Sequence, residues 1–412
     1  MQKYGGTSVA DAECIMRVAK RITDAFSKGN KIVVVLSAQG HTTDELLEKA
    51  KEINAKPSKR ELDMLLTTGE QQSVALMAVA IHKLGYPAIS LNAGQVGIHA
   101  TTSHGNARIK SIETDRIEKE LERNNIVLIA GFQGVNRYGD VTTLGRGASD
   151  TTAVALAAVL GADLCEIYTD VDGIYTADPR IVKSAVKLNE ISYDEMLELA
   201  SLGAQVLHNR SVEMAKRNRV NLVVRSSMTE EEGTLVKEET VEKQYVSGVA
   251  VDDDVARISI VGLEDRPGVA YHIFSILAKK KISVDIILQS IGRNSTKDIS
   301  FTVPHHDLKQ ALELLETQRD TIGFDMISYD ENISKLSVVG AGMASNPGVA
   351  SMMFEALYDS GINISMISTS EIKISVLIDR KYRDKALNAV HDRFVHKQVE
   401  MFKGRVNMDE NL

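Results

Sequence analysis

The sequence predicts an α/β protein. Its first half is a mostly parallel sheet sandwiched by helices, and its second half is two small βαββαβ domains. Three observations predict this: strand-like and helix-like runs alternate up to about residue 225, the chain turns polar and charged over 229–248, and the remainder repeats itself. Alternating strands and helices favour a parallel sheet covered on both faces. At 412 residues the chain is long enough for two to three domains of ~150 residues each.

The strand candidates of the first half are short, apolar and β-branched, as strands covered on both faces are. They are Ile32–Leu36, Ile89–Leu91, Ile126–Ala130, Leu164–Thr169 and Leu222–Arg225. The patterns between them predict helices over Asp11–Phe26, Asp44–Ile53, Lys59–Leu84, Asn106–Arg123, Asp150–Leu160 and Asn209–Asn218. Ser192 and Glu195 fit a capping box that opens a further helix. Ligands of such sheets bind in the loops after the strands, so those loops are the candidate site.

The second half contains a duplication, in which Pro267-Gly268-Val269 recurs as Pro347-Gly348-Val349. The segment 282–286 recurs at 362–366, with the same offset. A repeat of this length predicts a duplicated small domain and not a solenoid. Because each copy is short for independent stability, we expect the copies to pair or the chain to dimerise. The predicted boundaries are 1–228 for the first domain, a linker at 229–248, and small domains at 249–328 and 329–412.

The composition restricts the possible partners. Hydrophobic residues make up 43% of the chain and charged residues 25%, as in ordinary soluble proteins. A net charge of −8 argues against nucleic acid or an anionic membrane as a partner. No apolar run approaches the ~20 residues that cross a bilayer, and the histidines are too scattered for a metal cluster. With only Cys14 and Cys165, we expect no disulfide framework and a cytoplasmic location.

The stretch Thr142–Thr152 is the first candidate for a site. It has a glycine turn, the cation Arg146 and then small hydroxyl and acidic residues that lead into a helical pattern. A glycine loop before a helix gathers free backbone N–H groups and the positive end of the helix dipole. A guanidinium is a two-pronged donor for a carboxylate or phosphate. Two interpretations stay open: an anion site, or a capped helix with an exposed arginine.

Other polar loops follow strands of the same predicted sheet. Lys3–Ser8 offers a lysine and a close backbone approach for phosphate, or is a plain turn. Ser37–Asp44 and Gly131–Gly134 are small-residue turns, and Thr169–Arg180 is rich in turn-forming residues. Glu70 is either a solvated acid or a ligand for an ammonium group. Several anion-friendly loops suit transfer of a phosphoryl group, which needs positioning and charge neutralisation more than a nucleophilic side chain.

Taken together, the motifs KYGGTS at 3–8, TTD at 42–44, GFQG at 131–134, TTLGRGASD at 142–150 and YTDVDGIYTADPR at 168–180 resemble the aspartokinase family. The resemblance covers essentially the whole chain. It implies an amino-acid-kinase domain followed by two ferredoxin-like ACT domains. It also implies transfer of the γ-phosphoryl group of ATP to the β-carboxylate of L-aspartate, the first step of lysine, threonine and methionine biosynthesis. Mg²⁺ would bridge the phosphates, mostly through water and phosphate oxygens.

The resemblance further implies roles for individual residues. Catalysis is assigned to Lys3, Arg146 and Asp150. The residues expected to frame aspartate are Ser37, Thr43, Glu70, Arg146, Gly147, Ser149 and Asp150. Among them, Arg146 would bind a carboxylate and Glu70 the ammonium group. The residues expected to bind ATP are Lys3, Tyr4, Gly5, Gly6, Ser37, Thr169, Asp170, Tyr175, Asp178 and Arg180.

In the second half, the resemblance implies regulation by a feedback amino acid, with lysine or threonine as the family expectation. The turn at Asp265–Ala270 offers free N–H groups to a carboxylate, or is an ordinary ferredoxin-like turn. The expected effector residues are Asp265, Gly268, Val269, Ala270, Gln289, Asn363, Ile364 and Ser370. We also expect a homo-oligomer or hetero-oligomer that forms through the ACT domains.

The sequence departs from the family pattern at Ala148, where glycine is usual, and at Gln205, where lysine is usual. The strand before Lys3 is also shorter than usual. Two alternatives therefore stay open. One is another amino-acid-kinase phosphotransferase acting on glutamate, acetylglutamate or a nucleotide, which the tandem ACT half argues against. The other is a non-catalytic, amino-acid-binding regulatory subunit, supported only by Gln205 and Ala148.

Overall fold

The computed structural model describes residues 1–145, 147–202, 206–238, 246–291, 296–343, 346 and 348–394. Contacts divide the chain into two compact units, which are described separately below. The first consists of Met1–Tyr175 and Lys187–Glu242, and the second of Thr176–Val186 and Lys243–Leu412. The short segment 176–186 therefore leaves the first unit and packs within the second. Among the described residues, no helix combines the length and apolar character needed to span a bilayer.

The first unit is built on an eight-stranded sheet with the order β10-β12-β11-β9-β1-β2-β6-β3. Every neighbouring pair is parallel except β11 with β12. In sheet order the strands are β10 (Glu190–Ser192), β12 (Thr234–Lys237), β11 (Leu222–Ser226), β9 (Cys165–Thr169), β1 (Gln2–Tyr4), β2 (Val33–Leu36), β6 (Ile126–Ala130) and β3 (Ala88–Leu91). The predicted mostly parallel sheet is confirmed. β12 lies within the range predicted as a linker.

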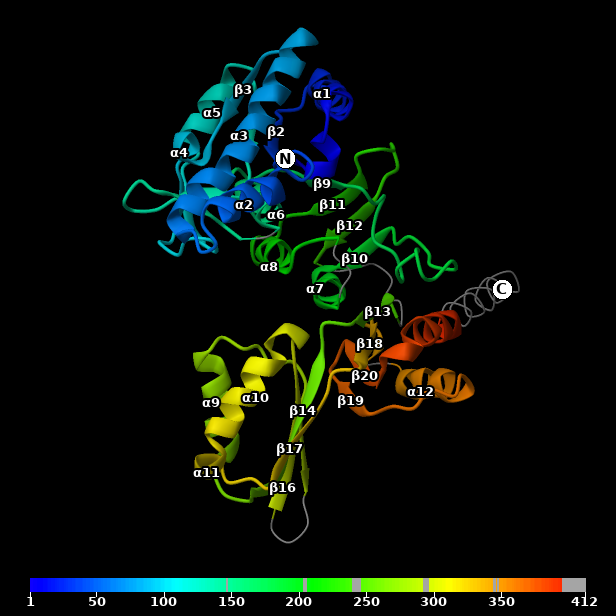
Figure 1. Cartoon of the computed structure of the whole chain (residues 1–412). Helices are drawn as coiled ribbons and strands as arrows, with labels where there is room; N and C mark the ends of the chain where they lie inside the picture. The colour runs from blue at the N-terminus through cyan, green and yellow to red at the C-terminus, as the bar shows by residue number, and fades with distance from the viewer. Residues whose placement is uncertain are drawn as a thin grey trace, which may run out of the picture. The chain divides into compact units, whose positions relative to one another are not determined.

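Helices cover both faces of this sheet. The helices of this unit are α1 (Ala12–Ser27), α2 (Thr42–Ile53), α3 (Lys59–Lys83), α4 (Ala93–Val96), α5 (Asp115–Glu122), α6 (Ala148–Val159), α7 (Tyr193–Ser201) and α8 (Asn209–Asn218), with a short 3₁₀ helix η1 (Gly6–Val9). On one face, α1 and α3 pack on each other and on the sheet (Figure 1). Successive side chains of a strand point to opposite faces. Tyr4 of β1 belongs to the α1 core, whereas Lys3 reaches Asp150 of α6, so α6 covers the other face.

The prediction of one helix over Asn106–Arg123 is wrong. Ile109–Ile112 forms β5, and the helix begins only at Asp115. The spacing of three between the two isoleucines imitates a helical period, but antiparallel pairing with β4 satisfies this backbone instead. β5 is the edge of a second sheet with the order β5-β4-β7-β8. Its other strands are β4 (Ile98–Ala100), β7 (Gln133–Val135) and β8 (Val141–Thr143).

The second unit contains two antiparallel sheets of four strands, with orders β15-β16-β14-β17 and β13-β18-β20-β19. The first sheet is formed by β14 (Ala256–Glu264), β15 (Ile287–Ile291), β16 (Thr296–Val303) and β17 (Met326–Asp330). The second is formed by β13 (Gly248–Asp252), β18 (Ile333–Val339), β19 (Met366–Thr369) and β20 (Lys373–Asp379). β13 therefore joins the sheet of the second repeat, although it precedes the first repeat in the chain.

The duplication is confirmed in the second unit. The helices α9 (Val269–Lys279) and α12 (Val349–Asp359) begin at matching positions of the two copies, each after a glycine with positive φ, Gly268 at 96° and Gly348 at 104°. Each repeat continues to a second helical region, with α10 (Leu308–Thr317) and α11 (Arg319–Ile322) in the first copy. In the second copy, residues 383–394 are helical.

The segment 176–186 packs into the core of the second repeat. Ala177 and Val182 are buried with side chains of β18, β20 and α12. The Thr176 carbonyl accepts a hydrogen bond from the Val249 N–H, and the Thr176 hydroxyl lies 2.8 Å from Nε2 of the buried His391. Burial of apolar side chains, which contributes about 25 cal/mol per Å², therefore stabilises the packing of the segment 176–186 in the second unit.

Candidate active site

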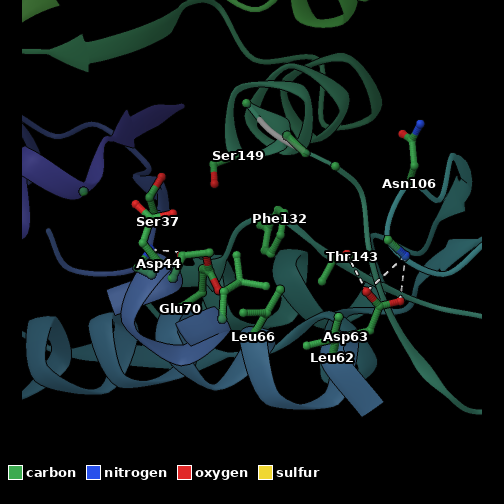
Figure 2. A pocket seen from close by; sticks show the side chains of 18 of the residues that line it. Ser37, Asp44, Leu62, Asp63, Leu66, Glu70, Asn106, Phe132, Thr143 and Ser149 are labelled. Carbon is green, nitrogen blue, oxygen red and sulfur yellow. Dashed lines mark hydrogen bonds between the residues drawn. The ribbon is translucent and has the colours of Figure 1, made fainter. Parts of the chain in front are cut away.

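A cavity of about 560 Å³ lies in the first unit, where loops after β1 and β2 meet the beginning of α6 (Figure 2). Eight residues predicted from the sequence line it: Lys3, Gly6, Ser37, Thr43, Glu70, Gly147, Ser149 and Asp150. Arg146, which was predicted for both catalysis and aspartate binding, lies outside the described residues. Gln205, the other departure from the family pattern noted above, also lies outside them.

Lys3 and Asp150 form an ion pair at the wall of this cavity. The Nζ of Lys3 on β1 lies 2.6 Å from Oδ1 of Asp150 on α6, and the two side chains are 11% and 10% exposed. Asp150 is in the first turn of α6, where the positive end of the helix dipole also favours its negative charge. The carboxylate therefore fixes a single ammonium group beside the glycines that follow β1.

The glycine loop after β1 packs directly on the loop after β2. The Gly6 carbonyl accepts a hydrogen bond from the Gly40 N–H, and a Cβ at Gly6 would lie only 2.7 Å from the Ala38 carbonyl oxygen. At Gly5, a Cβ would lie 3.6 Å from the Lys3 ammonium. Glycine is required at position 6 because the two backbones are in contact. The absence of side chains leaves room for a ligand beside Lys3.

The turn before α6 packs against the imidazole of His208, a residue that was not predicted from the sequence. Gly147 is the N-cap of α6 with φ +66°, and a Cβ there would overlap the imidazole of His208. Burial, with a smaller contribution from the Arg210 guanidinium, lowers the pKa of His208. The neutral ring therefore packs against the glycine. Arg210 donates to the Leu144 carbonyl at 2.6 Å and to the Ala107 carbonyl at 3.3 Å.

We expect Gly147→Ala to lower both the stability of the protein and the activity of the site, because the new methyl group must displace His208 in addition to straining the backbone. Gly161→Ala is the matched control. Gly161 follows the same helix with φ +59°, but no atom lies within 4 Å of the place that a Cβ would take there. The control should cost only the left-handed penalty of about 1–2 kcal/mol. Denaturant unfolding and steady-state kinetics measure both effects, and equal losses in the two variants would contradict this account.

Alanine at position 148 fits the site without distortion. The residue is 2% exposed, lines the cavity and packs with Ala100, Ala107 and Leu144 in a small apolar cluster. The methyl group therefore lies among apolar neighbours. The departure from the family's usual glycine is accommodated in this fold.

Glu70 places a buried carboxylate in the cavity from α3. The residue is 3% exposed, and its Oε1 accepts a hydrogen bond from the Ala38 N–H at 3.3 Å. Its Oε2 is buried and has no hydrogen-bond partner among the described residues. Burial raises the pKa of Glu70 from 4.5 to about 7, although backbone hydrogen bonds partly oppose this shift. A buried carboxyl group with a raised pKa in a cavity is a candidate for a functional role.

The sequence did not point to three further residues of the cavity, Asp63, His104 and Asn106, and it gave no individual role to Phe132 and Thr143, which lie in the predicted loops. A signal for Asp63 was available, because residues spaced by seven in a helix share a face. Asp63 precedes Glu70 by seven residues in α3 and faces the same cavity (Figure 2). For the loop 104–106 there was no such signal, since its place depends on the second sheet.

The residues predicted for the nucleotide lie mostly outside this cavity. The Tyr4 ring is fully buried and stacks on Tyr168 with 4.6 Å between ring centroids. The Gly5 N–H donates to the Tyr168 carbonyl. Thr169 donates through its hydroxyl to Asp170. These contacts lie in the first unit, at and beyond the end of β9.

The other predicted nucleotide residues follow further along the chain. The Tyr175 hydroxyl donates to Asp172. Asp178 and Arg180 belong to the segment 176–186 of the second unit and form an ion pair of 2.7 Å. Hydrogen bonding to Arg180 lowers the pKa of Asp178.

The predicted effector residues fall into two groups, one in each repeat of the second unit. Asp265 precedes α9 and pairs with Lys297 at 2.7 Å. Gly268 caps α9, Val269 and Ala270 form its first turn, and Gln289 lies on β15. In the second repeat, Asn363 and Ile364 follow α12, and Ser370 follows β19.

Comparison with known proteins agrees with this architecture. The amino acid kinase family matches residues 2–226, and the ACT domain matches residues 258–318 and 336–394. The chain is 52% identical to an aspartokinase of Geobacillus stearothermophilus over 396 residues, which covers 96% of each chain. It is 51% identical to an aspartokinase of Helicobacter pylori over 400 residues, covering 95% of this chain and 98% of the relative.

Solved structures give the same result. The structure of E. coli aspartokinase III in complex with aspartate and ADP is 25% identical and covers 96% of this chain and 99% of that one, with a TM-score of 0.81. An aspartate kinase from Synechocystis is 44% identical, with a TM-score of 0.54, and covers 95% of this chain and 69% of that one. The chain therefore belongs to the aspartokinases of the amino acid kinase family, with two ACT domains in its second half.

Proposed function

We propose that the chain is an ATP:L-aspartate 4-phosphotransferase. It transfers the γ-phosphoryl group of ATP to the β-carboxylate of L-aspartate and yields 4-phospho-L-aspartate, the first step of lysine, threonine and methionine biosynthesis. The observation that carries the proposal is the convergence of an ammonium group, a carboxylate and a helix N-terminus in one cavity. The relatives at about half identity over nearly the whole chain support it.

Each part of the cavity matches one part of the substrates. The carboxylate of Glu70 receives the ammonium group of aspartate, because its Oε2 is buried without a partner among the described residues. The start of α6, with Gly147 and Ser149, receives a carboxylate of aspartate through N–H groups and the helix dipole. Lys3 and the Gly5–Gly6 turn receive the phosphoryl group in transfer, with Ser37 between the two substrates.

The reaction needs little more from the protein than this placement. The attacking β-carboxylate of aspartate has an ordinary pKa near 3.9 and is already ionised at neutral pH, so no base has to remove a proton. The β-carboxylate oxygen attacks the γ-phosphorus as the bond to the β-phosphate oxygen of ATP breaks. The Lys3 ammonium neutralises charge on the transferring group, and such electrostatic stabilisation is commonly the largest catalytic effect.

ATP and Mg²⁺ complete the proposal. Among the described residues, no three His, Cys, Asp or Glu side chains form a group that could hold a metal. We propose that Mg²⁺ accompanies ATP and would be held mainly by phosphate oxygens and water, as is usual for kinases. When bound, the ion would neutralise phosphate charge. Within the first unit, we assign the nucleotide to Lys3, Tyr4, Gly5, Gly6, Ser37, Thr169, Asp170 and Tyr175, with Tyr4 contributing through its backbone.

The assay that tests this function is ADP formation with a panel of acceptors. We expect turnover that depends on L-aspartate, with little or none on glutamate, acetylglutamate or a nucleoside monophosphate. Turnover with another acceptor alone would support a different phosphotransferase of the family. No turnover with any acceptor, together with binding of lysine or threonine, would support a regulatory subunit.

We further propose that a feedback amino acid, lysine or threonine, binds at the two groups of ACT residues and that subunits associate through these domains. A ligand that binds only the folded state stabilises it by about 2.7 kcal/mol at 100 times its dissociation constant. Thermal unfolding against a panel of amino acids should therefore show a raised midpoint for the effector. D-lysine and D-threonine are the controls. An equal shift for both enantiomers, or none for any amino acid, would contradict this assignment.

A further inference from the structure

Asp63 is a buried carboxylate in the cavity whose oxygens are already occupied by the protein. The residue is 1% exposed. It accepts a hydrogen bond of 2.6 Å from the Thr143 hydroxyl and bonds of 3.1 and 3.0 Å from the Gly105 N–H to its two oxygens. Nδ1 of His104 lies 2.8 Å from its Oδ2. A carboxylate with these partners is not a free receptor for substrate, so any effect of Asp63 is exerted through the groups that it holds.

These groups come from segments far apart in the chain. His104 and Gly105 belong to the loop that leads into β5, and Thr143 ends β8. The two segments are joined directly, because the Ala107 N–H donates to the Thr143 carbonyl at 2.9 Å. Asp63 therefore ties α3 to both segments at the same place. Loss of a buried charged acceptor commonly costs more than an average hydrogen bond, because its donors are left unsatisfied.

A cation from another helix holds the next residues of the same two segments. Arg210 of α8 donates to the carbonyls of Leu144 and Ala107 and lies 3.5 Å from Oδ1 of Asn106. At Gly145, a Cβ would lie 2.9 Å from the same amide oxygen. The rim of the cavity formed by Asn106 and Gly145 is thus placed between Asp63 and Arg210. This rim leads directly into Gly147 and α6.

We propose that Asp63 is a positioning residue for aspartate, which orders the segments 104–106 and 143–145 so that the turn before α6 is shaped to receive the substrate. The inference rests on the aspartate kinase function proposed above. The hydrogen bonds and ion pairs of Asp63 among the described residues involve neither Lys3 nor the glycine turn after β1. Its loss should therefore weaken aspartate binding and leave ATP binding nearly unchanged. Proximity and orientation of this kind have large effects on catalysis when they are lost.

The test is a set of matched variants assayed with each substrate varied in turn. For Asp63→Asn we expect the KM for aspartate to rise about tenfold or more, while the KM for ATP stays within about twofold. Thr143→Val removes the hydroxyl donor at nearly constant shape, whereas Thr143→Ser keeps it. His104→Ala removes the imidazole, whereas His104→Asn retains a donor near Nδ1. In each pair, the first variant should raise the KM for aspartate, whereas the second should have a KM close to that of the wild-type protein.

Glu61, an exposed carboxylate on α3, the helix that also carries Asp63, provides the control. Glu61→Gln removes an acid whose side chain is 64% exposed and which pairs only with Arg60 among the described ion pairs. It should leave both KM values unchanged. In the double variant Asp63→Asn/Thr143→Val, the loss of apparent affinity for aspartate, expressed as a free energy from KM, should be smaller than the sum of the losses in the two single variants. Both changes break the same hydrogen bond. Additive losses, or equal increases in both KM values for Asp63→Asn, would indicate general destabilisation and overturn the inference.

Hydrogen exchange gives a second readout that needs no turnover. In Asp63→Asn the amides of 104–107 should exchange faster, while those of β2 and β6 stay protected. An unchanged exchange rate at 104–107 would overturn the inference in any case. If the wild-type protein turns over aspartate but Asp63→Asn keeps its KM, the inference fails alone. If the wild-type protein shows no aspartate-dependent turnover, the proposed function fails, and the assignment of Asp63 to aspartate fails with it.

Discussion

Replacement of Lys3 by alanine is expected to lower kcat for aspartate phosphorylation by roughly 10³-fold, the largest effect that we expect of any single substitution. Lys3 places its ammonium group 2.6 Å from Asp150 at the cavity wall, next to a turn in which Gly5 and Gly6 carry no side chains. No other lysine or arginine that the structure describes lines the cavity except Lys59 of α3. Quenched-flow or steady-state measurement of ADP formation with saturating substrates gives kcat directly.

Controls are needed because Lys3→Ala also leaves the Asp150 carboxylate partly buried without its cation. Such an unpaired charge destabilises proteins by several kcal/mol in typical cases. The double variant Lys3→Ala/Asp150→Asn removes both charges and should recover stability without recovering activity. Lys31→Ala changes an exposed lysine ahead of β2 and should have no effect on kcat. If Lys3→Ala keeps most of its activity, the phosphate site is not at the end of β1.

The second large effect concerns Glu70 and pH. Burial raises the pKa of this carboxyl to about 7, so the free enzyme loses the charged form as pH falls through neutrality. If Glu70 binds the ammonium group of aspartate, kcat/KM for aspartate should be constant above about pH 8. Below about pH 7 it should fall tenfold per unit. Glu70→Gln should raise the KM for aspartate at pH 8 and abolish this part of the pH dependence.

The contribution of Glu70 to the stability of the ligand-free protein should depend on pH in the opposite sense to kcat/KM, because it should decrease as the pH rises. The folded pKa of Glu70 is raised above the ordinary value of 4.5. Its contribution to stability is therefore fully present below pH 4.5 and is lost as pH rises through about 7. Glu70→Gln removes this loss and should increase the free energy of unfolding at pH 8 by up to about 3 kcal/mol. Glu61→Gln, on the exposed side of α3, serves as the control.

These two predictions for Glu70 together distinguish a role in substrate binding from a purely structural role. Glutamine has nearly the same shape as glutamate, so removing the buried charge should raise the free energy of unfolding at pH 8 whatever the role of Glu70. Only a residue that binds the ammonium group of aspartate should also raise the KM for aspartate when it is changed. Chemical unfolding and kinetics on the same preparations measure both quantities. A Glu70→Gln variant that is less stable at pH 8 and retains the wild-type KM would contradict the proposed role.

Much of the fold could be predicted from sequence because its signals are local. The buried strands β2 and β6 are continuous apolar runs, and α8 has the predicted bounds Asn209–Asn218. The capping box of Ser192 and Glu195 is present at the start of α7. The repeat in the second half required only a comparison of the chain with itself. In these cases, short-range pattern and tertiary structure favour the same conformation.

The features that sequence missed depend on partners distant in the chain. Strand β5 needs β4 beside it, and without that partner its isoleucines fit a helix equally well. The packing of 176–186 in the second unit depends on side chains from much later in the chain, such as Leu336 and Val376. At the site, the loops at 3–6, 37–43 and 147–150 were predicted by their glycines and small residues. Asp63 was not predicted, because its partners His104 and Thr143 are distant in the chain and its spacing of seven from Glu70 indicates only a shared helix face.

The measurement that tests the central claim most directly is a crystal structure of the protein with aspartate and a non-hydrolysable ATP analogue. We predict that aspartate lies in the cavity of the first unit, with its ammonium group within hydrogen-bond distance of Glu70. The terminal phosphate should lie within reach of Lys3. Density for both ligands at another place, with the Lys3–Glu70 cavity empty, would contradict the account.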